Sequence, residues 1–249
     1  MGRQILDPDA EEGAKVLMDQ EKIWTHFQGA GIRSFDLAEP RYDALAREVV
    51  KRAVGHHGRV LNIGIGGGGV EKRMMRSGWK VISVDPDKAS VARMQALGVD
   101  ARLGYAQKIP VETGLVDALV ISEVLEHIPD ENRPSAIAEL ARVLKPDGVL
   151  IGTVPYREDL SGSETVCPAC GNVFHRWGHV ASFDEQRLLA EMSPHFRVLR
   201  CRSRAFVNWR SGRSLRRFLK NGAKWILGRM GEGIVNPSLF FVARRRDSE

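Results

Sequence analysis

The 249-residue sequence contains only three cysteines and no uninterrupted apolar run that approaches the roughly 20 residues needed to span a bilayer. So few cysteines argue against a disulfide scaffold, and a reducing cytoplasm is the expected compartment. The first residues are followed by acidic ones rather than by an apolar h-region, so we expect no secretory signal. With 43% hydrophobic residues, the chain is expected to fold around a globular core.

The net charge of +6 is unevenly distributed along the chain. Residues 1–150 carry 20 Lys and Arg against 22 Asp and Glu, whereas residues 151–249 carry 17 against 9. A basic C-terminal half favours an anionic substrate, a nucleic acid or a membrane surface as partner. A solvated basic face explains the same charge equally well.

Apolar runs alternate with amphipathic segments, which predicts an α/β fold. We expect a Rossmann-like, doubly wound, mostly parallel sheet of seven strands, at 60–63, 80–84, 99–103, 116–122, 149–154, 196–202 and 239–244. Helices are expected at 10–30, 42–54, 70–77, 88–97, 133–144 and 184–192, with a turn at 146–148. The predicted organisation is an N-terminal helical segment (1–57), the core (58–155), a small Cys/His insertion (156–182) and the C-terminal part of the core (183–249).

A glycine cluster follows the first predicted strand and opens a helix. Gly64, Gly66 and Gly68 let backbone N–H groups approach a ligand closely, and the start of the helix attracts negative charge. Asp85 ends the second strand, 21 residues after Gly64, where its carboxylate can accept the hydroxyl protons of a ribose. By itself this pattern also fits a nicotinamide dehydrogenase.

Four motifs in the expected order across residues 59–155 resemble the class I S-adenosylmethionine-dependent methyltransferases of type 11. They are residues 60–68 (VLNIGIGGG), 83–85 (SVD), 117–128 (DALVISEVLEHI) and 142–148 (RVLKPDG). Dehydrogenases do not show the last two motifs. The resemblance therefore implies S-adenosylmethionine as the cofactor.

The resemblance also implies a cofactor site along the carboxyl ends of the strands. Its expected residues are Asn62, Gly64, Gly66, Gly68, Asp85, Pro86, Tyr105, Ala106, Ser122 and Glu123. Two positions depart from the family pattern: Asn62 stands where an acidic residue is usual, and Tyr105 stands where an aspartate is frequent. These departures motivate an alternative hypothesis, a cofactor-binding regulator without catalytic activity.

The reaction that the resemblance implies is an in-line displacement, in which an oxygen or nitrogen of the acceptor attacks the sulfonium methyl. A hydroxyl nucleophile needs a base. Glu123 and His127 lie just past the fourth strand, on the ligand side of the sheet, and are the candidate catalytic residues. A structural role for His127 at the start of a helix is the competing interpretation.

The insertion contains Cys167, Cys170, His175 and His179 at the spacing CxxC-x4-H-x3-H. Thiolates and imidazoles are the ligands that zinc prefers, so the sequence predicts a four-ligand structural Zn²⁺ without an open coordination position. Two alternatives remain: the cysteines are reduced surface residues, or a histidine belongs to the active site.

Most of residues 20–185, including 23–28 (IWTHFQ) and the insertion, resemble bacterial methyltransferases encoded among glycan and cell-surface polysaccharide genes. The resemblance implies a small-molecule or glycan acceptor.

Residues 210–230 read as a basic amphipathic helix. The helix is expected to cap the core with its basic side solvated, to lie on an anionic membrane as a peripheral contact, or to clamp a phosphate-bearing acceptor or RNA. An RNA methyltransferase is thus a further alternative, although no RNA-binding module is recognisable. The oligomeric state stays open.

Overall fold

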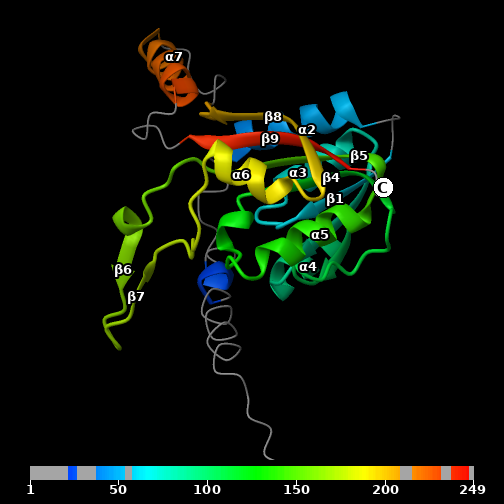
Figure 1. The fold of residues 1–249 in the computed structure, drawn as a ribbon, viewed down its shortest axis with the longest axis horizontal. Coiled ribbons are helices and arrows are strands. Elements are labelled where there is room, and N and C mark those ends of the chain that lie inside the picture. Colours follow the sequence, from blue (N-terminus) through cyan, green and yellow to red (C-terminus); the bar gives the residue numbers. More distant parts are fainter. Residues whose placement is uncertain (1–21, 27–37, 54–57, 208–214, 231–236, 247–249) are drawn as a thin grey trace, which may run out of the picture.

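A computed structural model describes residues 22–26, 38–53, 58–207, 215–230 and 237–246. Its centre is a seven-stranded sheet in the order β3-β2-β1-β4-β5-β9-β8 (Figure 1). The strands are β1 (Arg59–Ile63), β2 (Lys80–Asp85), β3 (Asp100–Leu103), β4 (Val116–Ser122), β5 (Leu144–Pro155), β8 (Phe196–Arg204) and β9 (Ser238–Arg245). The first five pair in parallel, and β9 runs antiparallel to both β5 and β8. The predicted α/β, mostly parallel sheet of seven strands is confirmed.

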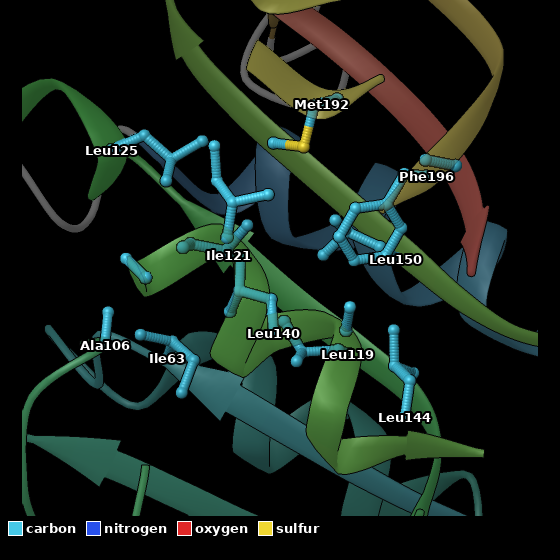
Figure 2. Packing of buried hydrophobic residues seen from close by; sticks show 14 of the residues in the cluster. Ile63, Ala106, Leu119, Ile121, Leu125, Leu140, Leu144, Leu150, Met192 and Phe196 are labelled. Carbon is cyan, nitrogen blue, oxygen red and sulfur yellow. The ribbon is translucent and has the colours of Figure 1, made fainter. Parts of the chain in front are cut away.

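Helices cover both faces of this sheet. These are α2 (Glu39–Arg52), α3 (Gly69–Arg76), α4 (Lys88–Gln95), α5 (Arg133–Val143) and α6 (Glu185–Met192). Helix α7 (Leu215–Met230) instead contacts the edge strand β8. Because successive residues of a strand point to opposite faces, the strands feed two separate apolar clusters. One cluster joins Leu61 and Leu119 to α5 and α6 (Figure 2), and the other joins Val60 to α2, α3 and α4.

The helices lie close to their expected positions, with local causes for the differences. Helix α2 begins at Glu39 rather than at 42, because Pro40 in its first turn supplies a helical φ where no N–H is needed. The predicted turn at 146–148 is a bulge within β5, in which Asp147 has a φ of 59°. A helix spans 22–26 within the N-terminal segment, and the rest of the helix expected at 10–30 lies outside the described residues.

The insertion folds as an antiparallel hairpin that the sequence did not predict. A 3₁₀ turn, η3 (Ser161–Ser163), leads into β6 (Glu164–Val166), which pairs with β7 (Val173–His175). The hairpin projects away from the sheet (Figure 1), and five of its six strand residues are exposed. Strands without a buried face show no alternation of apolar residues, which is why the pattern did not reveal them.

After the hairpin, the chain returns to the carboxyl edge of the sheet. Val180 N and Ala181 N both donate to the carbonyl oxygen of Glu126, at 2.8 and 3.1 Å. Glu126 belongs to η2 (Leu125–His127), the turn that follows β4. The insertion is thereby tied to the end of the sheet where parallel strands present their ligand-binding loops. Among the described residues, no helix has the length and apolar character needed to cross a membrane.

Candidate functional site: a cofactor cavity at the carboxyl ends of the strands

The glycine loop between β1 and α3 adopts a backbone that side chains disfavour. Gly64, Gly66 and Gly68 have φ values of 85°, 51° and 73°. At Gly64 a β-carbon would also lie 2.6 Å from Val124 Cγ2, closer than packed atoms approach. These glycines are therefore required by the turn itself, and their backbone stays open to a ligand at the start of α3.

Asp85 ends β2 and anchors this loop. Its carboxylate accepts hydrogen bonds from Ile65 N at 2.7 Å and Asp87 N at 2.8 Å, one to each oxygen, and the residue is 2% exposed. An ionised carboxylate has about four acceptor positions. Asp85 can therefore hold the loop and still accept from the hydroxyl groups of a ribose.

Asn62, the residue that departs from the family pattern, lies next to a buried carboxyl group. Its Nδ2 donates to Glu71 Oε1 at 2.7 Å and to the carbonyl oxygen of Gly64 at 3.0 Å. Ser83 Oγ donates to the same Glu71 oxygen at 2.9 Å. Burial raises the pKa of Glu71, which has no exposed surface. An acidic side chain, absent at position 62, thus lies next to the Asn62 amide nine residues later, on α3.

A cavity of about 920 Å³ opens over this loop. Ten of the predicted cofactor and catalytic residues line it: Asn62, Gly64, Gly66, Asp85, Pro86, Tyr105, Ala106, Ser122, Glu123 and His127. Gly68 does not line the cavity, although its left-handed φ shapes the loop. The fold therefore brings these ten residues together around one cavity.

Glu123 stands in the wall with a backbone φ of 56°, which a residue with a side chain rarely adopts. Its Oε2 lies 3.5 Å from Arg41 Nη1, and its buried Oε1 has no hydrogen-bond partner among the described residues. Arg41 comes from the first turn of α2 and was not predicted, because one arginine in a charged helix gives no signal in the sequence. Strained residues of this kind concentrate at functional sites.

His127 is held in one orientation by the insertion. Its Nδ1 lies 3.0 Å from the carbonyl oxygen of Gly178, and its ring packs edge-on against Trp24 and against His179, with centroids at 5.3 and 4.7 Å. Burial and the neighbouring His179 lower the pKa of His127 to about 3. The ring is therefore neutral at physiological pH.

Comparisons with known proteins agree with this geometry. Residues 61–152 match the family model described as a methyltransferase domain. An uncharacterized methyltransferase of Oceanobacillus iheyensis is 29% identical over 153 residues, which cover 61% of this chain and 67% of the relative. Over residues 61–152 the chain is therefore similar to methyltransferase domains.

A second sequence relative and one solved structure extend the comparison. A ubiquinone biosynthesis O-methyltransferase of Xanthomonas oryzae is 41% identical over 100 residues, which cover 37% of this chain and 41% of that enzyme. The match thus spans less than half of the enzyme's length. A 1,6-didemethyltoxoflavin-N1-methyltransferase of Burkholderia thailandensis, solved with 1,6-didemethyltoxoflavin and S-adenosylhomocysteine, has a TM-score of 0.66 over 99% of this chain and 94% of its own. At 17% identity, this likeness shows the shared fold alone.

The four predicted zinc ligands do not converge, so this ligand set needs correction. Cys167 and Cys170 lie at the tip of the β6–β7 hairpin, where Cys167 N donates to Asn172 O at 2.8 Å. His175 pairs with Glu164 at the hairpin base, three positions from Cys167, which is about 10 Å along a strand. The spacing predicted a compact knuckle, but the intervening residues form strands.

The histidines of the insertion instead meet carboxylates beside the cavity. His179 Nδ1 lies 2.5 Å from Glu158 Oε2, and His175 stacks on His179 with ring centroids 4.6 Å apart. His179 and Glu158 line the cavity. The alternative interpretation, in which a histidine of the insertion belongs to the functional site, fits this placement.

The basic helix α7 contacts β8, but its apolar side chains are not all buried. Leu219 and Ile226 are 62% and 53% exposed, so they do not cap the core as expected. Residues 210–214 lie outside the described part of the chain. Contact of this helix with a membrane or with RNA stays a prediction.

Proposed function

We propose that this protein transfers the methyl group of S-adenosylmethionine to an oxygen or nitrogen atom of a small-molecule acceptor. The observation that carries the proposal is one cavity in which a ribose-type carboxylate, Asp85, faces the end of β4, where Ser122, Glu123 and His127 stand. Cofactor groups and groups that can meet an acceptor thereby share one cavity. Proximity within such a space accounts for much of the rate enhancement in bimolecular transfer.

The cofactor has an orientation that the side chains support. Asp85 would accept from the ribose hydroxyls, and the loop from Gly64 would face the methionine end. Ala106 is buried, so its neighbourhood suits the adenine ring, whereas Tyr105 is 41% exposed and is better placed to cover the site's edge. Ser122, whose hydroxyl lies 2.8 Å from Thr153 Oγ1, would then stand beside the methionine moiety.

The acceptor would occupy the part of the cavity under the insertion. A volume of about 920 Å³ is near the upper end of the roughly 300–1,000 Å³ found for ligand pockets, so it suits a cofactor together with a second small molecule. Trp24 and Trp177 line this part and offer ring faces for stacking. A saccharide is the first acceptor class to test, since the aromatic wall and the resemblance of the insertion both favour it.

Glu123 is the proposed proton acceptor for a hydroxyl nucleophile. It faces the cavity, and its Oε1 is free of protein hydrogen bonds among the described residues. His127 is a weaker base, because a ring whose pKa is about 3 has little affinity for a proton. We therefore assign the base to Glu123 and a contact role to His127.

Calorimetric titration with S-adenosylhomocysteine, followed by transfer of radiolabelled methyl groups to fractionated saccharide and phenolic acceptors, tests the proposal. Binding with turnover on any small acceptor supports it, and Glu123→Gln should then lower kcat while cofactor affinity is retained. Binding without turnover on any acceptor would favour the non-catalytic regulator. Transfer to RNA alone, with salt-sensitive RNA binding, would favour the RNA methyltransferase.

A further inference from the structure

A group of imidazole and carboxylate side chains gathers where the insertion meets η2, on the wall of the cavity. Ligand-type atoms of Glu126, His127 and His179 lie within 4.8 Å of one another, and those of Glu158, His175 and His179 do so as well. Across the described parts of the chain, neither cysteine of the insertion belongs to such a group of three or more. The two groups share His179. Which group suits a cation therefore depends on which nitrogen of each histidine ring carries the proton.

Hydrogen bonding places the ring proton of His127 on Nδ1. The carbonyl oxygen of Gly178, 3.0 Å away, can only accept, so Nδ1 must donate to it. The Trp24 indole nitrogen also approaches Nδ1, at 3.3 Å, but this longer contact would need the opposite tautomer. A neutral His127 therefore keeps the lone pair on Nε2.

The same reasoning places the ring proton of His179 on Nδ1, which faces the Glu158 carboxylate at 2.5 Å. His179 Nε2 thus also keeps its lone pair. A carbonyl or carboxylate that accepts from the second ring nitrogen is the arrangement that surrounds metal-binding histidines in proteins, because it fixes the tautomer and the ring orientation. Both histidines are therefore prepared as ligands by neighbours that are already in place.

His175 carries its ring proton on the other nitrogen, Nε2. Its Nδ1 accepts from Trp177 N at 3.3 Å and from His179 N at 3.1 Å, which leaves the ring proton on Nε2, the nitrogen turned toward Glu158. A protonated ring nitrogen cannot ligate a metal. The group that contains His175 is thus a support for His179, on which it stacks, rather than a cation site.

Glu126 completes the other group. Its side chain has no exposed surface, and neither carboxyl oxygen has a hydrogen-bond partner among the described residues. Its backbone carbonyl, in contrast, holds the returning insertion through Val180 N and Ala181 N. A buried carboxyl group without a partner is costly, and a cation beside it removes that cost.

We propose that Glu126, His127 and His179 bind one divalent transition-metal ion of the zinc class on the acceptor side of the cavity. Two imidazoles and one carboxylate are the donor set of zinc sites that keep a position open. His127 and His179 both line the cavity, so the open position faces the space assigned to the acceptor, where water or an acceptor oxygen would complete the coordination. The insertion thus supplies a ligand and a supporting carboxylate, Glu158, from its base rather than thiolates from its tip.

The proposal is tested by metal content, which does not depend on turnover. The purified chain is stripped with a chelator, titrated with Zn²⁺ by calorimetry and analysed for bound metal. About one Zn²⁺ per chain is expected. Glu126→Gln, nearly isosteric, and His179→Ala should abolish the site, and Glu158→Gln should weaken it by ~10–100-fold through its effect on His179.

The double variant Cys167→Ser/Cys170→Ser is the matched control and should keep the full zinc stoichiometry. Substitution with Co²⁺ gives an independent spectroscopic test, since thiolate ligands produce an intense charge-transfer band that nitrogen and oxygen ligands lack. Circular dichroism and S-adenosylhomocysteine affinity establish that each variant is folded. Failure of the stripped wild type to bind Zn²⁺, or loss of zinc in the cysteine variant with retention in His179→Ala, would overturn the proposal and leave the methyl-transfer proposal untouched.

Discussion

Replacement of Asp85 by asparagine is the sharpest test of the cofactor site. The carboxylate accepts from two backbone N–H groups, Ile65 N and Asp87 N, and lines the cavity while only 2% exposed. Asparagine keeps one acceptor oxygen, but its NH₂ group would face one of these N–H donors. The substitution therefore removes the charge, disturbs the loop and leaves one ribose hydroxyl without an acceptor.

The expected loss of affinity follows from the hydrogen bonds to a charged group, which contribute about 1.5–3 kcal/mol each. Hydrogen bonds from two ribose hydroxyls to Asp85 therefore contribute roughly 3–6 kcal/mol to the binding free energy. Since about 1.4 kcal/mol corresponds to a factor of ten, S-adenosylhomocysteine should bind Asp85→Asn at least ~100-fold more weakly than the wild type. The lower end applies because the amide oxygen still accepts one bond.

Asp117→Asn is the matched control. Asp117 also accepts from a backbone N–H, Arg59 N at 2.8 Å, and from Lys145 Nζ at 2.6 Å, but it lies at the start of β4 and outside the cavity wall. Both variants should lower the free energy of unfolding in urea by ~1–2 kcal/mol. Only Asp85→Asn should lose calorimetric affinity for S-adenosylhomocysteine. Wild-type affinity in Asp85→Asn, or an equal loss in Asp117→Asn, would refute the assignment of the ribose to Asp85.

Two further substitutions test the loop and the insertion. Gly64→Ala should lower the free energy of unfolding by more than the ~1–2 kcal/mol of left-handed backbone strain, because its β-carbon would meet Val124 Cγ2 at 2.6 Å. Gly114→Ala is the control: its φ is 65° and its β-carbon would meet no atom within 4 Å, so urea denaturation should show the backbone strain alone. Equal losses of unfolding free energy in the two variants would contradict the close approach to Val124. Burial lowers the pKa of His127 from 6.5 to about 3, so the unfolded chain binds a proton that the folded chain does not between these values, and His127 makes the protein less stable as the pH falls from 6.5 to 3. In the metal-stripped chain, His127→Gln should flatten the pH dependence of the unfolding free energy in that window, and an unaltered slope would contradict the lowered pKa of His127.

The central sheet was predictable because its signals are contiguous. The parallel strands inside the sheet contain apolar runs bounded by turn residues, and burial on both faces makes such runs continuous. Only the edge strand β3 lacks such a run among the five described parallel strands. The glycine loop and Asp85 were predictable for the same reason: the loop lies in one segment, and the spacing to Asp85 follows from a single β-α-β unit.

The acceptor side was not predictable to the same extent, because it is assembled by chain reversals. Arg41 reaches Glu123 from a helix 82 positions earlier, and Glu158 meets His179 only after the hairpin has turned back. The predicted zinc set failed on the same ground. The spacing of the cysteines and histidines in the sequence does not show whether the chain between them folds back. In the structure this stretch forms a hairpin, with the cysteines at its tip and His175 at its base.

Asn62, which stands where the family usually has an acidic residue, is paired with an acidic residue from another element, Glu71. Its amide donates to Glu71 at 2.7 Å inside a site without solvent, so an aspartate at position 62, although usual in the family, would oppose a second carboxylate. Asn62→Asp should therefore lower the free energy of unfolding by ~3 kcal/mol or more, as expected for a buried charge without a partner. In the double variant Asn62→Asp/Glu71→Gln, the glutamine NH₂ group takes the place of the oxygen that both neighbours contact, so it can donate to the new carboxylate and to Ser83 Oγ. Urea denaturation should therefore show partial recovery relative to Asn62→Asp. Additive losses in that double-mutant cycle would mean that the two residues are not coupled.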